Sequence, residues 1–126
     1  MALHDTIDEE AIHALVHGFY ARVRQDDAIG PIFNDVIGDG WDAHLAKLCD
    51  FWSSVMLQTG RFNGRPMAAH MRLKGVRPEH FERWLMLFRQ TARETCSPAV
   101  AELFIDRAEN IARGFQLGMF YQPVRP

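Results

Sequence analysis

The sequence predicts an all-α fold in a single domain, because 126 residues fit one hydrophobic core. Between its turn-forming residues, every segment repeats apolar side chains at helical spacing. No segment alternates apolar and polar residues over the length of a strand. Pro66, Pro78 and Pro98 each precede such a segment and suit the first turn of a helix. We expect an ordered core over about residues 6–120 with short termini.

The first predicted helix begins near Ile7. Thr6 and Glu9 have the spacing of a capping box, in which each side chain binds a backbone N–H of the first turn. Apolar residues then recur every three or four positions, as one stripe: Ile12, Leu15, Val16, Phe19 and Val23. We expect this stripe to face the core.

Four further helices are predicted from the remaining periodic segments. Their ranges are Trp41–Thr59, Pro66–Leu73, Pro78–Thr95 and Pro98 to about Phe120. Gly30-Pro31 and the pair Gly38 and Gly40 are typical of turns. No helix is therefore predicted between them.

Composition excludes several classes of protein. Fourteen Lys and Arg against sixteen Asp and Glu give a formal charge of −2, without the positive excess that nucleic-acid binding requires. Two cysteines, Cys49 and Cys96, form no disulfide framework, and the N-terminus resembles no signal peptide. No apolar run approaches the roughly 20 residues of a membrane span. We expect a cytoplasmic protein with reduced thiols and no membrane insertion.

Six histidines are the main candidates for chemistry. His13 and His17 are four residues apart, a spacing at which two imidazoles can share a zinc ion. The glutamate of a helical HExxH motif is absent, and spacing ties no Cys or carboxylate to the pair. The sequence therefore gives zinc little support.

Three polar side chains stand on or beside apolar helix faces. His44 heads a face formed by Leu48, Phe51 and Val55, and Lys47 lies at its edge, where an anion could be met. Trp84 lines up with apolar residues of its helix, and Tyr20 borders the first stripe. Either Tyr20, His44 and Trp84 converge on one site, or each is an ordinary core residue, and spacing does not decide between these readings. Trp41, Met119 and Phe120 are candidates for surface contacts.

The segment around His70 suggests a cofactor. Its helix is too short to be stable alone, and apolar and basic residues flank the histidine: Arg65, Met67, Met71, Arg72, Leu73 and Lys74. Haem fits this description, since its iron needs an axial nitrogen, its ring needs apolar walls and its propionates need cations. His80 is a rival ligand that composition does not separate from His70.

Four strings resemble the group III truncated haemoglobins of bacteria: FYARVRQDDAIGPIF, WDAHLAKLCDFWSSVMLQTGRFNGRPMAAH, PEHFERWLMLF and RAENIARGF. The resemblance extends from about Thr6 to Met119. It implies a shortened globin fold, a two-over-two helical sandwich in which the helix before the proximal histidine is nearly absent. It also implies haem b as the cofactor.

The resemblance implies a role for each site residue. His70 matches the proximal iron ligand, which excludes His80 from that role. Tyr20 and Trp84 match the distal hydrogen-bond donors, and His44 matches a distal histidine that donates, gates the pocket or binds iron itself. The haem contacts implied are Phe33 on the porphyrin, Leu48, Phe51 and Trp52 in the distal wall, and Lys47, with Arg65, Arg72, Lys74 and Arg77 as alternatives, at the propionates.

The implied function is binding of O₂, CO or NO. Two distal donors would slow the release of O₂, which favours reaction with NO or peroxide, or sensing, over oxygen transport. An enzyme of this kind needs an external reductase, because the chain has no GxGxxG motif and no room for a flavin or nicotinamide domain. The alternative is a cofactor-free all-α interaction module, which would be colourless.

Overall fold

Five helices make up the fold of the residues that the computed structural model describes, 3–62 and 76–120. They are α1 (Glu9–Gln25), α2 (Gly30–Ile37), α3 (Trp41–Leu57), α5 (Pro78–Thr95) and α6 (Pro98–Phe120). No strand occurs in these ranges; a single parallel bridge joins His4 to Cys96. The all-α prediction is confirmed.

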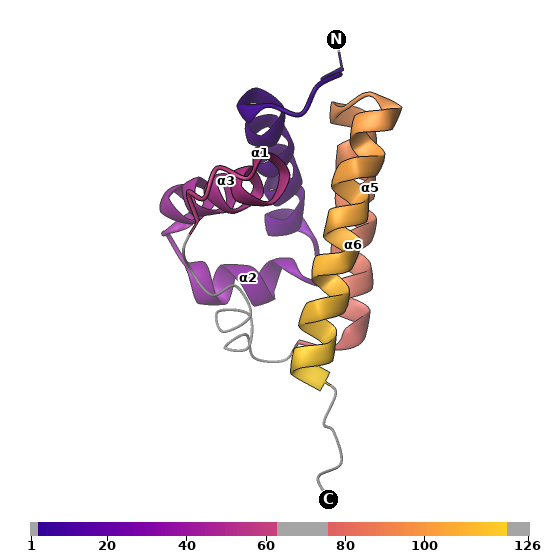
Figure 1. Ribbon diagram of the computed structural model, residues 1–126. Coiled ribbons are helices and arrows are strands. Elements are labelled where there is room, and N and C mark those ends of the chain that lie inside the picture. Colours follow the sequence, from indigo (N-terminus) through magenta and orange to yellow (C-terminus); the bar gives the residue numbers. More distant parts are fainter. Residues whose placement is uncertain (1–2, 63–75, 121–126) are drawn as a thin grey trace, which may run out of the picture.

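The helices pack in two groups, α5 with α6 and α1 with α2 and α3 (Figure 1). The long helices α5 and α6 lie side by side, and α1 packs against both α5 and α3. The short helix α2 follows α1 and lies below α3, toward the end of the molecule where α6 terminates. This arrangement brings side chains of α1, α2, α3 and α5 toward one interior.

The capping box predicted for the first helix is wrong. Asp8 is the N-cap, and its carboxylate accepts the N–H of Ala11 at 2.8 Å. That hydrogen bond lowers the pKa of Asp8. Thr6 donates its hydroxyl to Asp8 at 3.2 Å, and Glu9 accepts the hydroxyl of Ser53 at 2.6 Å. The helix therefore begins two residues later than predicted, because a nearer carboxylate caps it and Glu9 is used to hold α3.

The structure contains a helix, α2, where the sequence predicted only turns. Gly30 and Pro31 open this helix instead of interrupting the chain. Gly30 is needed here, since a Cβ atom would lie 2.9 Å from the carbonyl oxygen of Arg24. The residues that signal a turn are therefore the first residues of the helix that carries Phe33.

The other helix boundaries agree closely with prediction. α3 ends at Leu57 rather than Thr59, because Gln58 adopts a left-handed conformation with φ of 56° and its N–H bonds to Ser54. α5 and α6 have the predicted bounds. The helix predicted over Pro66–Leu73 lies outside the described residues.

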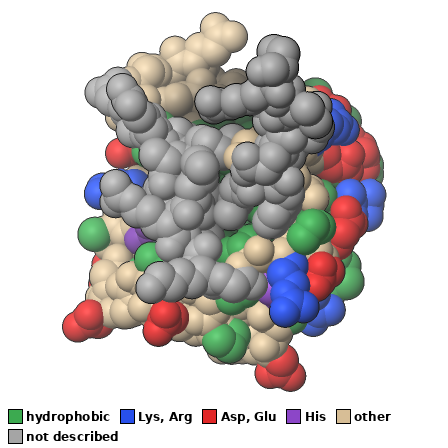
Figure 2. Space-filling model, turned by 90° about the horizontal axis from the view of Figure 1, so that it is seen from below, with side chains coloured by type: hydrophobic (Ala, Val, Ile, Leu, Met, Phe, Trp, Pro, Cys, Tyr) green, Lys and Arg blue, Asp and Glu red, His purple; other side chains and the backbone are tan. Residues whose placement is uncertain are grey.

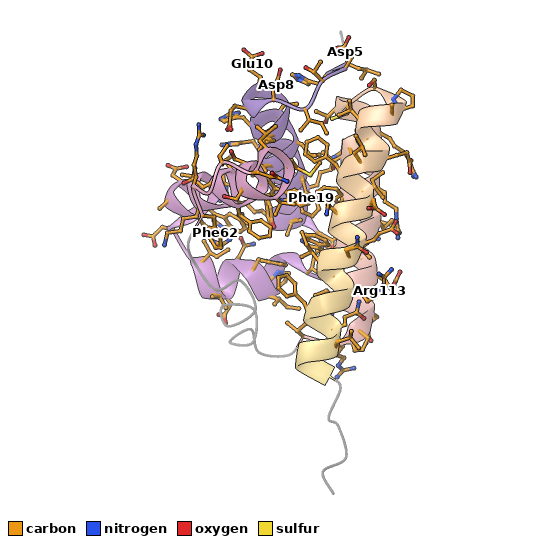
Figure 3. All side chains as sticks on the ribbon, viewed as in Figure 1. Asp5, Asp8, Glu10, Phe19, Phe62 and Arg113 are labelled. Atoms are coloured by element: carbon orange, nitrogen blue, oxygen red, sulfur yellow. The ribbon has the colours of Figure 1, made fainter. Side chains whose placement is uncertain are left out.

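The core follows the predicted stripe of α1, all five of whose members are buried. Phe19, labelled in Figure 3, packs edge-to-face on Phe88 with ring centroids 5.1 Å apart. Trp52 of α3 stacks on Phe88, with ring centroids 5.3 Å apart, and lies edge-on to Phe104, with ring centroids 6.0 Å apart. Large aromatic side chains thus fill the space between α1, α3, α5 and α6.

Candidate functional site

Tyr20 is the centre of the site. It projects from α1, and only 4% of its surface is exposed to solvent. Phe33 of α2 lies edge-on at 6.3 Å between ring centroids, and His44 of α3 lies edge-on at 6.5 Å. The structure therefore brings Tyr20 and His44 together with Phe33, the aromatic residue of the missed helix.

Trp84 of α5 completes the polar part of the site. A hydrogen bond joins its indole to the phenol of Tyr20. Since an indole N–H only donates, Tyr20 accepts this bond and keeps its own proton to donate elsewhere. Burial raises the pKa of Tyr20 to about 12, with the bond from Trp84 acting in the opposite direction. Tyr20 is therefore a neutral hydrogen-bond donor at neutral pH.

This geometry answers the question that spacing left open. Tyr20, His44 and Trp84 come from three helices and meet around one phenol, through a hydrogen bond and a ring contact. Phe19 lies beside both Tyr20 and Trp84, at ring distances of 4.7 and 5.2 Å. The convergent interpretation is the one that the fold supports.

Trp41 belongs to this cluster, and its prediction as a surface residue is wrong. It is 3% exposed and lies 5.9 Å from the ring of Tyr20 and 5.7 Å from that of His44. Its indole donates to Asn34 at 3.0 Å, and the guanidinium of Arg24 covers its ring at 4.9 Å. The signal was present in the sequence, because Trp41 precedes His44 by about one helical turn.

An apolar cavity opens beside Trp84, between α2, α5 and α6. The empty volume of the cavity is about 430 Å³, part of which is open to solvent. Its walls are mostly aromatic and aliphatic: Ile29, Ile32, Phe33, Val76, His80, Phe81, Trp84, Ala112 and Phe115. Such a lining, with few polar groups, is typical of sites for apolar ligands and cofactors.

His80 lines this cavity but has a structural role. Its Nδ1 atom accepts the backbone N–H of Arg77 at 2.9 Å, which caps the start of α5. A neutral imidazole that accepts at Nδ1 carries its proton on Nε2, so neither nitrogen has a lone pair left for a metal. The geometry therefore disfavours His80 as a metal ligand.

The remaining predicted residues lie at different depths. Leu48 and Phe51 are half-buried on α3, and Lys47 is exposed. Trp52 contacts Phe51 at 5.8 Å but lies mainly in the core described above. His70 and Arg72, with Arg65 and Lys74, lie outside the described residues.

An ion pair between buried Asp26 and half-exposed Arg83 links the segment before α2 to α5. The carboxylate of Asp26, 3% exposed, accepts the N–H groups of Ala28 and Ile29 at 3.0 Å each, before α2. It also accepts two N–H groups of Arg83 at 2.6 and 2.7 Å, one residue before Trp84. These partners outweigh the effect of burial, which by itself raises the pKa, and the pKa of Asp26 is lowered.

Replacing Asp26 by asparagine should destabilise the protein by about 2 kcal/mol at pH 7, since it breaks a buried charged contact whose partner Arg83 is half-exposed. A folded-state pKa below the ordinary value gives stability that is complete above that ordinary value and is lost as pH falls through the folded one. The difference between Asp26→Asn and the parent should therefore shrink below about pH 4 in denaturant titrations. Asp27→Asn, at an exposed neighbour, is the control. A difference that is independent of pH would contradict this assignment.

The described side chains contain no group of three or more metal-ligating residues able to hold an ion. Within the same part of the chain, no helix is both long and apolar enough to cross a membrane. Viewed from below, Figure 2 shows Lys or Arg beside Asp or Glu along one edge of the molecule.

Comparisons with known proteins agree with the fold and with the sequence resemblance. The family model for bacterial-like globins matches residues 2–114. Group 3 truncated hemoglobin ctb of Campylobacter jejuni is 37% identical over 121 residues, which cover 94% of both chains. The crystal structure of group III truncated hemoglobin from Campylobacter jejuni aligns with a TM-score of 0.91 and 34% identity, over 98% of this chain and 100% of that one. The predicted truncated-globin fold is confirmed, and the chain belongs to the bacterial-like globin family, among its group III truncated haemoglobins.

Proposed function

We propose that this protein binds haem b and, at the haem iron, a diatomic gas such as O₂, CO or NO. The observation that carries the proposal is the pair of Tyr20 and Trp84, a buried phenol and a half-buried indole joined by a hydrogen bond beside an apolar cavity. A neutral phenol supported by an indole suits a small polar ligand held among apolar walls. Membership of the globin family supports haem as the group that brings this ligand to them.

The residues of the cavity fit a porphyrin. Its walls include Phe33, Phe81 and Phe115, which offer flat apolar surface to a flat apolar ring. The resemblance implies that His70 is the iron ligand, and the use of His80 as a helix cap supports this assignment. We assign Lys47 and Arg72 to the propionates and Leu48, Phe51 and Trp52 to the distal wall.

Bound haem would supply an iron that takes up a diatomic ligand. Tyr20 would donate a hydrogen bond from its phenol to that ligand, and Trp84 would support it, either through its bond to the phenol or by donating to the ligand directly. Trp41 and Phe33 hold the ring of Tyr20 in place by packing against it. His44 stands beside Tyr20, as a third donor, a gate or an alternative iron ligand.

Two donors make slow O₂ release the expected behaviour. A hydrogen bond to a charged acceptor contributes about 1.5–3 kcal/mol, and each 1.4 kcal/mol is a factor of about ten in rate. The bond from Tyr20 alone would slow dissociation by about one to two orders of magnitude, and by more where Trp84 donates to the ligand instead of to the phenol. This favours NO dioxygenation, weak peroxidase activity or sensing over oxygen transport, and the two reactions need an external reductase.

Titration of the haem-depleted protein with haemin tests the proposal. Trp41 and Trp84 lie in or beside the site, so their fluorescence should be quenched as haemin binds, with saturation at about one haem per chain. A cofactor-free interaction module would show no saturable quenching and no new visible absorption band.

A further inference from the structure

A pair of stacked histidines lies outside the aromatic cavity, on the exposed side of α1. His13 and His17 are one helical turn apart and both are exposed. Their ring centroids are 3.9 Å apart and their planes are inclined by only 19°. The proposed gas-binding function uses neither residue.

A carboxylate lies near the pair. Partial burial and the charge of His13 both lower the pKa of His17. Asp42, in the first turn of α3, has the opposite effect on His17, so a carboxylate lies within electrostatic reach. A nearby carboxylate attracts cations.

We propose that His13 and His17 form a two-imidazole site for a divalent transition-metal ion of the zinc and copper class. Two nitrogens bound tetrahedrally at about 2.1 Å lie about 3.4 Å apart. The ring centroids of His13 and His17 are 3.9 Å apart, so the two side chains are close enough to share an ion once both rings turn out of their stacked arrangement and point their nitrogens at it. The spacing is that of the paired histidines in helical zinc motifs.

The proposed site has open coordination positions, and its ion should exchange readily with ions in solution. No third ligand joins the pair among the described side chains, so water completes the coordination of the ion. Asp42 contributes through its charge and not as a ligand. Imidazole ligands select borderline transition metals over Mg²⁺ and Ca²⁺, and Cu²⁺ should bind more tightly than Zn²⁺.

The test is a titration of the full chain with Zn²⁺, monitored by calorimetry and by NMR signals of the imidazoles. The protein carries no affinity tag and is treated with a chelator beforehand. The two rings should shift together and saturate at one ion per chain. His13→Ala and His17→Ala should each weaken binding by about tenfold or more, because each removes one of two ligands. Asp42→Asn should weaken it by only a few-fold.

The control is His4→Ala, because the hydrogen bonds of His4 shown by the structure come from its backbone and survive the change. Both alanine variants of the pair should fold, since alanine favours an exposed helical position. Circular dichroism checks this. Equal Zn²⁺ affinity in the parent and in a His13→Ala/His17→Ala double variant would overturn the proposal, as would competition by Mg²⁺ at similar concentration.

Discussion

Replacing His70 by glycine should weaken haem binding by more than about 100-fold. The substitution removes the proposed axial nitrogen, and loss of even an indirect contact to a metal ligand costs about 10–100-fold in affinity. The measurement is the rate of haem transfer from the variant to an excess of a haem-scavenging apoprotein, monitored by visible absorption.

Two controls make the His70 experiment specific. Added imidazole should enter the space left by the side chain and restore the absorption spectrum of His70→Gly, which a misfolded variant would not allow. His80→Gly should lose haem far more slowly than His70→Gly, because it removes a wall residue of the cavity and a helix cap but no iron ligand. If haem loss is fast from His80→Gly and slow from His70→Gly, the assignment of the two histidines is wrong.

Replacing Tyr20 by phenylalanine should raise the O₂ dissociation rate by about tenfold to a hundredfold. The variant loses one hydrogen bond worth about 1.5–3 kcal/mol to a charged acceptor, and it keeps the ring that packs on Phe33 and Trp41. Stopped-flow displacement of O₂ by CO measures the rate.

The comparison variant is Trp84→Phe, which removes the partner of Tyr20 without removing its phenol. Its O₂ dissociation should also be faster, and the double variant should show less than the product of the two effects, because the two groups act together. If O₂ dissociates from Tyr20→Phe at the same rate as from the parent, the phenol of Tyr20 does not hold the ligand.

Much of the fold could be predicted because periodic apolar residues report directly on helices. The stripe of α1 and the prolines that begin α5 and α6 gave those helices within a few residues. Gly30-Pro31 was interpreted as a loop instead of a helix start, because glycine and proline are favoured both in β-turns and at the beginning of helices. The cap at Asp8 was missed because two nearby side chains, Thr6 and Asp8, both fit the signal.

The site was harder to predict because it depends on contacts between helices. Helical spacing placed Tyr20, His44 and Trp84 on or beside apolar faces, but their meeting around one phenol depends on how α1, α3 and α5 pack. Trp41 was missed for the same reason: its burial comes from α1 and α2 and not from its own helix. The tautomer of His80 required the geometry of a single hydrogen bond.

The visible absorption spectrum of the freshly purified protein, recorded before and after dithionite and then CO, tests most directly whether Tyr20 and Trp84 serve a haem pocket. We expect a haem spectrum that changes on reduction and shifts again with CO, with an absorbance that corresponds to one haem per chain. A colourless protein that gains no such spectrum when haemin is supplied would contradict it.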